Sequence, residues 1–302
     1  MRAVVARTTD TPGQVQVVDL PTPQPGPSDV AIRTVAAAVN PVDVFVAHRG
    51  FHGIMPLEHP DSTGLGWDVA GTIESVGSDV SATRPDLVVG ARVAATHHGP
   101  DKAVGALAEV AVVPATAVAI VPDDLDLVEA ATVPLNALTA QQAVDLLGTP
   151  SGTLLVTGAA GAVGGYATPL ATRAGWTVVG LARESDRAFV EGSGARLVTT
   201  LDGLRVDAVL DAAVLPASLA AVGDGGRYVG LQPAFPVAAE RGITTSAVAM
   251  VDDGEALTAL LVETAAGRMP TRLAATYPLS EAAKAVDAVG AGGLRGRVVV
   301  TF

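Results

Sequence analysis

The chain has 302 residues, of which 49% are hydrophobic and 17% are charged, so it is long and apolar enough for one large domain or two ordinary ones with packed cores. Its net charge of −12, with no block of Lys and Arg, disfavours nucleic acids and anionic membranes as partners. The chain has no cysteine, which excludes disulfides, thiolate metal sites and a cysteine nucleophile.

Residues 1–117 show short β patterns separated by frequent turns, which is typical of a small barrel-like domain. The first two patterns predict a hairpin around residues 11–13, and Asn40-Pro41 opens a short helix. Residues 50–66, with several Gly and Pro, predict a loop. The expected strands cover residues 1–7, 14–19, 29–38, 68–76, 88–94, 106–113 and 117–121.

From residue 122 the pattern changes to a helical one over 127–147, interrupted at Pro134. Strands and helices then alternate, which predicts a parallel, doubly wound sheet with right-handed crossovers. The last strand, 297–302, is expected to rejoin the first domain. The expected strands are 153–157, 177–182, 196–199, 207–211, 227–231 and 243–248, and the helices are 163–174, 185–192, 254–266 and 280–289.

Residues 153–165 predict a dinucleotide phosphate site. Three glycines follow a strand and precede a helix, so the backbone can turn tightly and approach a pyrophosphate at the helix N-terminus. The alternative is a close crossing of helix and strand without a ligand. The predicted contacts are Gly158, Ala160, Gly161, Ala162, Val163 and Gly164.

The tip of the next strand indicates which dinucleotide binds. Arg183 comes first, and Ser185 and Arg187 follow. Guanidinium groups suit a 2′-phosphate because they are planar cations with several donors, so the sequence favours NADPH. Two alternatives stay open: the arginines pair with Glu184 or Asp186, or Glu184 holds the ribose of NAD.

Seven short motifs follow one another along the chain: NPVD at 40–43, GWDVAG at 66–71, GALAE at 105–109, LTA at 138–140, GAAGAVG at 158–164, GRYVG at 226–230 and GRVVV at 296–300. In this order and spacing the chain resembles the medium-chain dehydrogenase/reductases, in their zinc-free NADPH:quinone oxidoreductase branch. The resemblance implies an α/β fold with a GroES-like catalytic domain over 1–119, completed by 272–302. It also implies a Rossmann domain over 120–271, a cleft between the domains and a homodimer, with 243–248 as a candidate interface.

Zinc-dependent relatives carry a metal-binding Cys where this chain has Asn40, and a His where it has Trp67. Asp68 is then the remaining ligand-type residue, whereas a catalytic zinc needs three protein ligands. The histidines at 48, 52, 59, 97 and 98 fit no standard metal spacing. The resemblance therefore implies chemistry without a metal.

Hydride transfer without a Lewis acid suits an acceptor that is already electrophilic, such as a quinone or an α,β-unsaturated carbonyl. Asn40 either donates to a carbonyl or a cofactor hydroxyl, or forms a structural Asn-Pro turn with Asp43 as a helix cap. His52 either donates a proton or orients the substrate, or is an exposed polar residue. By resemblance, the residues bordering the cofactor are Thr139, Ala213, Gly230 and Leu231; packing within the sheet is the alternative.

We expect an NADPH-dependent reductase of quinones or other activated alkenes or carbonyls. An enoyl-thioester reductase is an alternative, although some relatives of that kind use an early tyrosine and Tyr166, Tyr228 and Tyr277 all follow residue 119. A non-catalytic NADPH-binding sensor or structural protein is another, because a fold does not fix a function. The polar start of the chain and the lack of an apolar run of about 18 residues predict a cytoplasmic protein.

Overall fold

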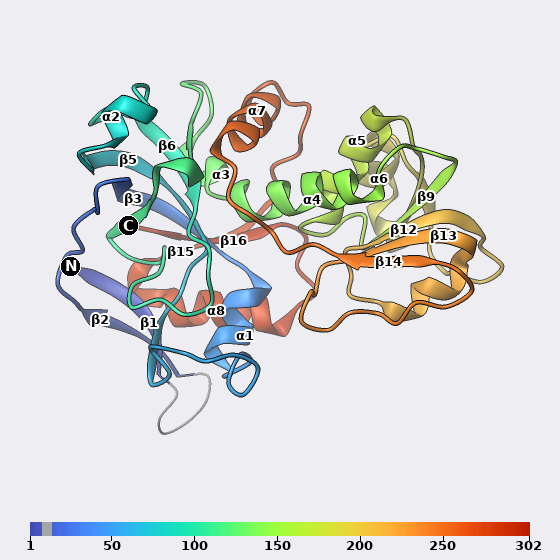
Figure 1. Cartoon of the computed structure of the whole chain (residues 1–302), viewed down its shortest axis with the longest axis horizontal. Helices are drawn as coiled ribbons and strands as arrows, with labels where there is room; N and C mark the ends of the chain where they lie inside the picture. The colour runs from blue at the N-terminus through green and yellow to red at the C-terminus, as the bar shows by residue number, and fades with distance from the viewer. Residues whose placement is uncertain (8–13) are drawn as a thin grey trace. The chain divides into compact units, whose positions relative to one another are not determined.

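The computed structural model describes residues 1–7 and 14–302, so the turn predicted at 11–13 lies outside the described residues. The chain forms two compact units, residues 1–135 with 252–302 and residues 136–251 (Figure 1). The sequence placed the domain boundaries at 119 and 271. Unit 1 is larger than the predicted first domain for two reasons. Helix α3 (Leu127–Ala130) packs on the strands β3 (Asp29–Val39) and β5 (Asp68–Val76), and helix α7 (Gly254–Ala265) packs on β8 (Val118–Ile120).

Unit 1 is rich in β structure, as the sequence predicted. A three-stranded sheet has the order β2-β1-β4, and a larger sheet has the order β15-β16-β3-β5-β6-β8, with β7 also paired to β3. Strand β16 pairs antiparallel to β3, which confirms that the last strand rejoins the first domain. The strands are β1 (Arg2–Arg7), β2 (Gln14–Asp19), β3 (Asp29–Val39), β4 (Ser62–Gly64), β5 (Asp68–Val76), β6 (Arg92–Thr96), β7 (Val110–Pro114), β8 (Val118–Ile120), β15 (Leu273–Pro278) and β16 (Arg297–Thr301).

Strand β3 is central to the larger sheet, since it pairs with β16, β5 and β7. Hydrophobic clusters form around it: Val39 belongs to one and Ile32 to another. Helix α8 packs on β2, β15 and β16 and against α1. Besides α3 and α7, the helices described in this unit are α1 (Pro41–Ala47), α2 (Val80–Thr83) and α8 (Ala282–Ala291).

Unit 2 is built on a six-stranded sheet of order β11-β10-β9-β12-β13-β14, and every neighbouring pair is parallel. The strand order confirms the parallel, Rossmann-type sheet expected from the alternating pattern. No helix of the described residues is long and apolar enough to cross a membrane. The strands are β9 (Thr153–Thr157), β10 (Thr177–Leu181), β11 (Arg196–Val198), β12 (Val206–Asp211), β13 (Val222–Gly230) and β14 (Thr244–Ala247), and the helices are α4 (Pro134–Leu147), which begins in unit 1, α5 (Gly164–Ala174) and α6 (Arg187–Gly192).

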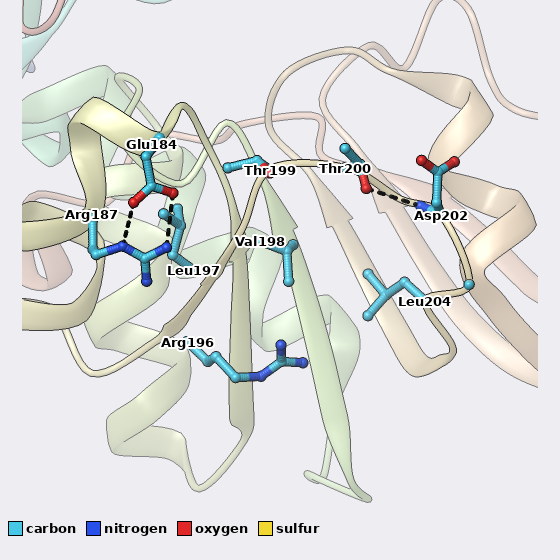
Figure 2. A pocket seen from close by; sticks show the side chains of 10 residues that line it. Glu184, Arg187, Arg196, Leu197, Val198, Thr199, Thr200, Asp202 and Leu204 are labelled. Atoms are coloured by element: carbon cyan, nitrogen blue, oxygen red, sulfur yellow. Dashed lines mark hydrogen bonds and ion pairs between the residues drawn. The ribbon is translucent and has the colours of Figure 1, made fainter.

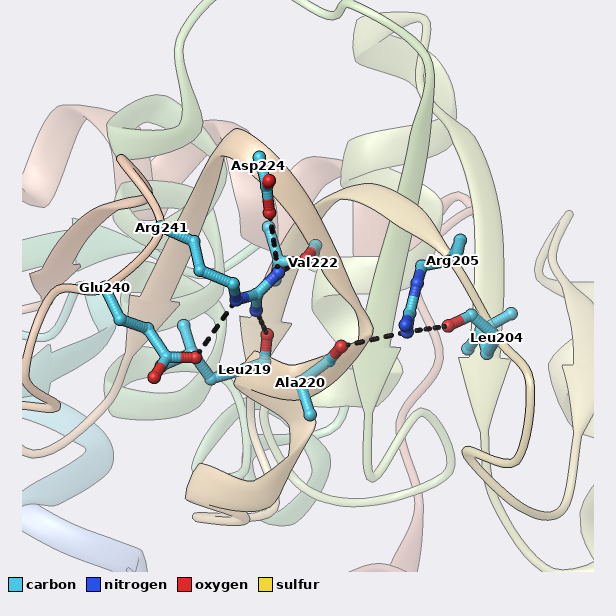
Figure 3. Close-up of polar contacts among 8 residues, drawn as sticks. All are labelled: Leu204, Arg205, Leu219, Ala220, Val222, Asp224, Glu240 and Arg241. Carbon is cyan, nitrogen blue, oxygen red and sulfur yellow. Dashed lines mark hydrogen bonds and ion pairs between the residues drawn. The ribbon is translucent and has the colours of Figure 1, made fainter.

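Two arginines fix the connection between β12 and β13, which contains a short 3₁₀ helix (Figure 3). The Arg241 guanidinium donates to the carbonyls of Leu219 and Val222, at 2.9 and 2.7 Å. Arg205 donates to the carbonyl of Ala220 at 3.0 Å. These side chains therefore satisfy carbonyls at the end of a helix too short to satisfy them itself.

The structure corrects several predicted element boundaries. Val88 and Val89 lie exposed in a turn, and β6 begins at Arg92 rather than at 88. The strand predicted at 106–113 begins at Val110, because the residues before it bond to the segment 65–66. The loop predicted at 50–66 contains β4, which pairs with β1. Helices α6 and α8 begin two residues later than predicted.

The close approach of β3 and β5 requires glycine at position 71. A Cβ there would lie 2.0 Å from the carbonyl oxygen of Arg33. We expect Gly71→Ala to lower the free energy of unfolding by about 1–3 kcal/mol, because the backbone of a central strand must shift. Urea unfolding checks this. Gly192→Ala is the control, since its Cβ meets no atom within 4 Å; equal losses in both variants would contradict the argument.

Candidate functional site

The glycine turn of unit 2 connects β9 to α5. Gly158 has a φ of 59°, and a Cβ on Gly164 would lie 2.2 Å from the Gly158 carbonyl oxygen. The Gly161 N–H donates to that oxygen at 2.7 Å and closes the turn. No side chain caps the N-terminus of α5. A tight turn followed by an uncapped helix fits the phosphates of a dinucleotide.

The carboxyl ends of four neighbouring strands lie in register at one edge of this sheet. Thr157 pairs with Leu181 of β10 and with Asp211 of β12, and Asp211 pairs with Gly230 of β13. Ligands of open parallel sheets bind outside such ends. The structure thus brings the glycine turn and the ends of these strands to one edge, where Arg183, Ser185, Ala213 and Leu231 follow them in the chain. Thr139 is partly exposed on α4.

The buried carboxylate of Asp211 accepts hydrogen bonds from residues at and near these strand ends. It accepts hydrogen bonds from the hydroxyls of Thr157, at 2.5 Å, and Tyr228, at 2.6 Å, and from the N–H of Leu215, at 2.7 Å. The Thr157 hydroxyl also accepts the N–H of Ala213 at 2.9 Å. Burial and the hydrogen bond to Asp211 raise the pKa of Tyr228 above its usual range. The loop after β12 is therefore fixed beside the glycine turn.

Arg187 and Arg183 differ in their partners. Arg187 forms two hydrogen bonds with Glu184, of 2.6 and 2.8 Å, and another with Glu191, of 2.6 Å. Arg183 is exposed and forms no ion pair within residues 1–7 and 14–302. The pairing that the sequence left open thus holds for Arg187, and Arg183 is the cation available to a ligand.

A cavity of about 390 Å³ adjoins the Glu184–Arg187 pair and is lined by β11 and the segment that follows it (Figure 2). Thr199, Thr200 and Asp202 supply polar groups to its wall, and Leu197 and Leu204 supply apolar ones. The Asp202 N–H bonds to the Thr200 hydroxyl, at 3.4 Å. The cavity therefore has a mixed lining of polar and apolar groups.

Unit 1 holds a second group of candidate functional residues, which we call the polar cluster: Asn40, Asp43, Asp68 and Lys102. The Asp43 carboxylate accepts the backbone N–H of Asn40 at 2.8 Å and that of Gly66 at 2.7 Å. The Asn40 side-chain amide donates to Asp68 at 2.7 Å. The other Asp68 oxygen accepts the N–H of Leu135 at 2.6 Å. The contact between Asp43 and the Asn40 backbone is the helix cap that the sequence offered as the structural alternative, and a catalytic role for both residues stays a prediction.

Lys102 places a positive charge inside the polar cluster. Only 8% of its surface is exposed, and its ammonium donates to the carbonyls of Gly66 at 2.8 Å and His97 at 2.7 Å. The Lys102 Nζ atom also lies 4.6 Å from the centre of the Trp67 ring, within the range of a cation–π interaction. The ammonium therefore joins the residues before β5 to those after β6.

His52 lies in the turn after α1, where Arg49 is its neighbour. The Arg49 guanidinium donates to the His52 Nδ1 atom at 3.4 Å. A catalytic role for His52 stays a prediction.

Tyr277, one of the three tyrosines, lies on β15 of unit 1 and packs against a hydrophobic cluster.

Comparisons with known proteins agree with this arrangement. The model of the alcohol dehydrogenase GroES-like domain matches residues 26–123, and that of the zinc-binding dehydrogenases matches residues 187–300. The trans-enoyl reductase thnE of Trichoderma harzianum is 30% identical over 259 residues, which cover 74% of this chain and 67% of thnE. The chain belongs to the medium-chain dehydrogenase/reductase superfamily.

Solved structures of this superfamily of oxidoreductases share the whole fold. The quinone oxidoreductase of Coxiella burnetii has a TM-score of 0.86 at 25% identity and covers 100% of this chain and 99% of its own. The mycobacterial protein Rv1454c, solved in complex with NADPH, has a TM-score of 0.81 at 28% identity and covers 100% of both chains. The chain spans 64%, 56% and 36% of three further curated relatives, two trans-enoyl reductases and a 2-methylene-furan-3-one reductase.

The polar cluster does not fit the catalytic zinc of other members of the superfamily. The Asn40 amide presents an N–H to Asp68, and the Trp67 indole has no lone pair to offer. Both oxygens of Asp43 accept backbone N–H groups. Within the described residues, no three His, Asp or Glu side chains gather in a group that would hold a metal. Zinc prefers several nitrogen, sulfur or carboxylate ligands around it, which these residues do not offer.

Burial shifts the titration of the polar cluster toward neutral pH. It raises the pKa of Asp43 to about 6, against the hydrogen bonds to Asn40 and Gly66 and the charge of Lys102. Burial, with the charge of Asp43, raises the pKa of Asp68 to about 7, against its hydrogen bonds and the charge of Arg297. Burial also lowers the pKa of Lys102 to about 8, against the attraction of the carboxylates. A buried cluster of this kind is typical of functional sites.

Sequence reasoning did not select Asp68, Lys102 or Asp211 as site residues. Lys102 follows a Gly-Pro-Asp stretch, where a charged side chain is expected in solvent, and only contacts distant in sequence bury it. Asp211 did carry a signal, because it ends a strand whose preceding residues are apolar. A carboxylate at that position can bond the neighbouring strand ends.

The raised pKa of Asp68 makes stability depend on pH. Between its unfolded value of 3.8 and about 7, the folded carboxyl keeps a proton that the unfolded one has lost, so the free energy of unfolding falls as pH rises. Asp68→Asn removes this dependence. We expect the wild type to lose roughly 1 kcal/mol or more relative to Asp68→Asn from pH 4 to pH 8, measured by urea unfolding.

The control for this measurement is Asp287→Asn, an equal change of charge on an exposed site of α8. His97, whose pKa is lowered to about 3, acts in the opposite direction but is present in every variant, so it cancels in the difference. A difference between wild type and Asp68→Asn that does not vary with pH would contradict the raised pKa.

Proposed function

We propose that the protein is an NADPH-dependent oxidoreductase of the zinc-free branch that transfers a hydride to a quinone or another activated alkene or carbonyl. The observation that carries this proposal is the Asn40–Asp68 hydrogen bond of 2.7 Å, formed at a position where zinc-dependent relatives bind their metal. A site that offers hydrogen bonds in place of a Lewis acid favours acceptors that are already electrophilic.

The choice of NADPH rests on unit 2. The glycine turn, the uncapped α5 and Ala213 would hold the pyrophosphate side, while Arg183 and Ser185 would hold the 2′-phosphate. The strongest support is the exposed guanidinium of Arg183, which forms no ion pair with the residues that the structure describes, together with the NADPH complex of the mycobacterial relative. When bound, NADPH supplies the hydride and is oxidised to NADP⁺.

The role of this chain is then to orient the acceptor and to stabilise negative charge on its oxygen. We assign Asn40 to this task as a donor held by Asp68, with Asp43 fixing the turn that carries it. His52 stays a second candidate, with Arg49 donating to its ring. A solvent proton completes the reduced product.

An enoyl-thioester reductase is the second candidate function. The observation that favours it is the name of several relatives, including thnE, as trans-enoyl reductases. Their names fit the same chemistry, because an enoyl thioester is also an activated alkene. A non-catalytic NADPH-binding protein is the third, and it predicts tight binding without turnover.

We also propose a cytoplasmic homodimer. Strand β14 forms one edge of the described six-stranded sheet and pairs there with β13. An edge strand presents backbone groups that a second copy can pair with.

The substrate proposal is tested by mixing the protein with NADPH and separate panels of quinones, enones and enoyl thioesters, and following NADPH absorbance. We expect quinones or enones to accelerate NADPH oxidation more than enoyl thioesters do. Faster oxidation with thioesters would favour the second function. NADPH binding without turnover on any panel would favour the third.

The cofactor proposal is tested with Arg183→Glu. We expect the dissociation constant of NADPH to rise by about 10- to 100-fold, since a charge-assisted contact is lost and a like charge is added, while that of NADH changes far less. Arg173→Glu makes the same change of charge near the other end of α5 and is the control. Equal weakening of NADPH and NADH by Arg183→Glu would contradict the 2′-phosphate contact.

A further inference from the structure

His97 follows β6 directly, and both polar groups of its backbone are held. Its N–H donates to the Trp67 carbonyl at 2.7 Å, and its carbonyl accepts the Lys102 ammonium at 2.7 Å. Thr96, the residue before it, pairs with Asp68 between β6 and β5. The His97 side chain therefore begins from a fixed point beside the polar cluster.

The two nitrogens of the His97 ring have different surroundings. The Nδ1 atom is buried and has no hydrogen-bond partner among the described residues, although the residue as a whole is partly exposed. A proton on Nδ1 would be a buried donor without an acceptor, which is costly. We therefore place the proton of the neutral ring on Nε2.

The ring is neutral over the working pH range. Burial, and then the charge of Lys102, lowers the pKa of His97 to about 3. Asp43, Asp68 and Asp252 act on Lys102 in turn and favour its charged form. A neutral imidazole that presents Nε2–H is a donor that does not release its proton, which suits stabilisation of a developing oxyanion.

We propose that the Nε2–H group of His97 donates a hydrogen bond to the carbonyl oxygen of the substrate as that oxygen becomes negative, which makes His97 a catalytic residue. This rests on the proposed function, and it adds a donor beside Asn40. Its basis is the fixed backbone, the buried Nδ1 atom and the position of the residue next to Trp67 and the polar cluster.

The hydride leaves a C–H bond of the dihydronicotinamide, which gives NADP⁺, and forms a C–H bond at the β-carbon of an enone. The π pair of the C=C bond moves to the α-carbon and carbonyl, and the oxygen becomes negative. His97 bonds that oxygen and keeps its own proton, while solvent supplies the proton at the α-carbon. In a quinone the same addition leaves an enolate that solvent protonates on oxygen. Loss of the proton at the new sp³ carbon to solvent, with protonation of the second carbonyl oxygen, then gives the hydroquinone.

The kinetic test compares His97→Leu with His97→Gln in the full chain. Leucine removes the donor, and we expect kcat for the best acceptor of the wild type to fall by roughly 100-fold with the dissociation constant of NADPH unchanged. Glutamine keeps an N–H donor and is expected to stay within about tenfold of the wild type. His48→Leu, at an exposed histidine after α1, is the control for loss of an imidazole.

A His97→Leu protein that folds and keeps kcat within about threefold of the wild type would overturn the proposal. If leucine prevents folding, the glutamine variant and the spectra below decide. A fall in NADPH affinity as large as the fall in kcat would also overturn it, because the residue would then serve cofactor binding.

The second readout needs no turnover. In ¹⁵N spectra of the imidazoles, assigned with His97→Gln, we expect Nε2 of His97 to be protonated, Nδ1 to be unprotonated, and neither signal to titrate between pH 5 and pH 8. Addition of 4-nitrophenolate, a stable oxyanion, should shift the Nε2–H signal, while nitrobenzene should not. A proton on Nδ1, or no shift with the phenolate, would overturn the proposal. If the wild type reduces no acceptor, the proposed function fails, and these spectra still decide whether His97 binds an oxyanion.

Discussion

Unit 1 depends on the hydrogen bonds that the Asp43 carboxylate accepts. Its two oxygens accept backbone N–H groups from Asn40, at the end of β3, and from Gly66, just before β5. A buried carboxylate is costly unless its lone pairs are satisfied, and here the start of α1 and the turn before β5 satisfy it together. Neither segment can move without leaving a buried charge or a buried N–H without a partner, so this one side chain fixes where β3 ends and β5 begins.

The rest of the polar cluster follows from that constraint. With Asn40 fixed, its amide reaches Asp68, whose other oxygen holds the N–H of Leu135. The Gly66 carbonyl, fixed by the same turn, is one of the two acceptors for Lys102. The charge of the buried Lys102 ammonium favours the ionised form of Asp43, while the charge of Asp43 disfavours ionisation of Asp68. Because breaking such a set leaves uncompensated charge, we interpret it as a rigid support for the donors at its surface.

Local patterns allowed much of this to be predicted from sequence. The glycine turn, the helix after Asn40 and the alternation of strands and helices are encoded by neighbouring residues, and the structure contains all three. The strand predicted from Val88 was wrong, because an apolar pair in a turn has the same composition as the start of a strand. Lys102 and His97 carried no local signal at all. Lys102 bonds to residue 66 and His97 to residue 67, which lie about thirty positions earlier in the chain. The pairing of β5 with β6 brings these residues together.

Local contacts also explain why Arg187 and Arg183 differ in their ion pairs. Arg187 lies three residues after Glu184 and four before Glu191, and such spacings on a helix favour ion pairs, so its charge is neutralised by its own neighbours. Arg183 precedes this turn, and the acid three residues after it, Asp186, is buried, whereas Arg183 is exposed. Exposed ion pairs are weak, so the pairing of Arg187 contributes little to stability. The pairing nevertheless occupies Glu184 and Glu191, which therefore do not bind Arg183. A local pairing that is nearly neutral for folding therefore leaves one guanidinium at the strand tip available for an anionic ligand.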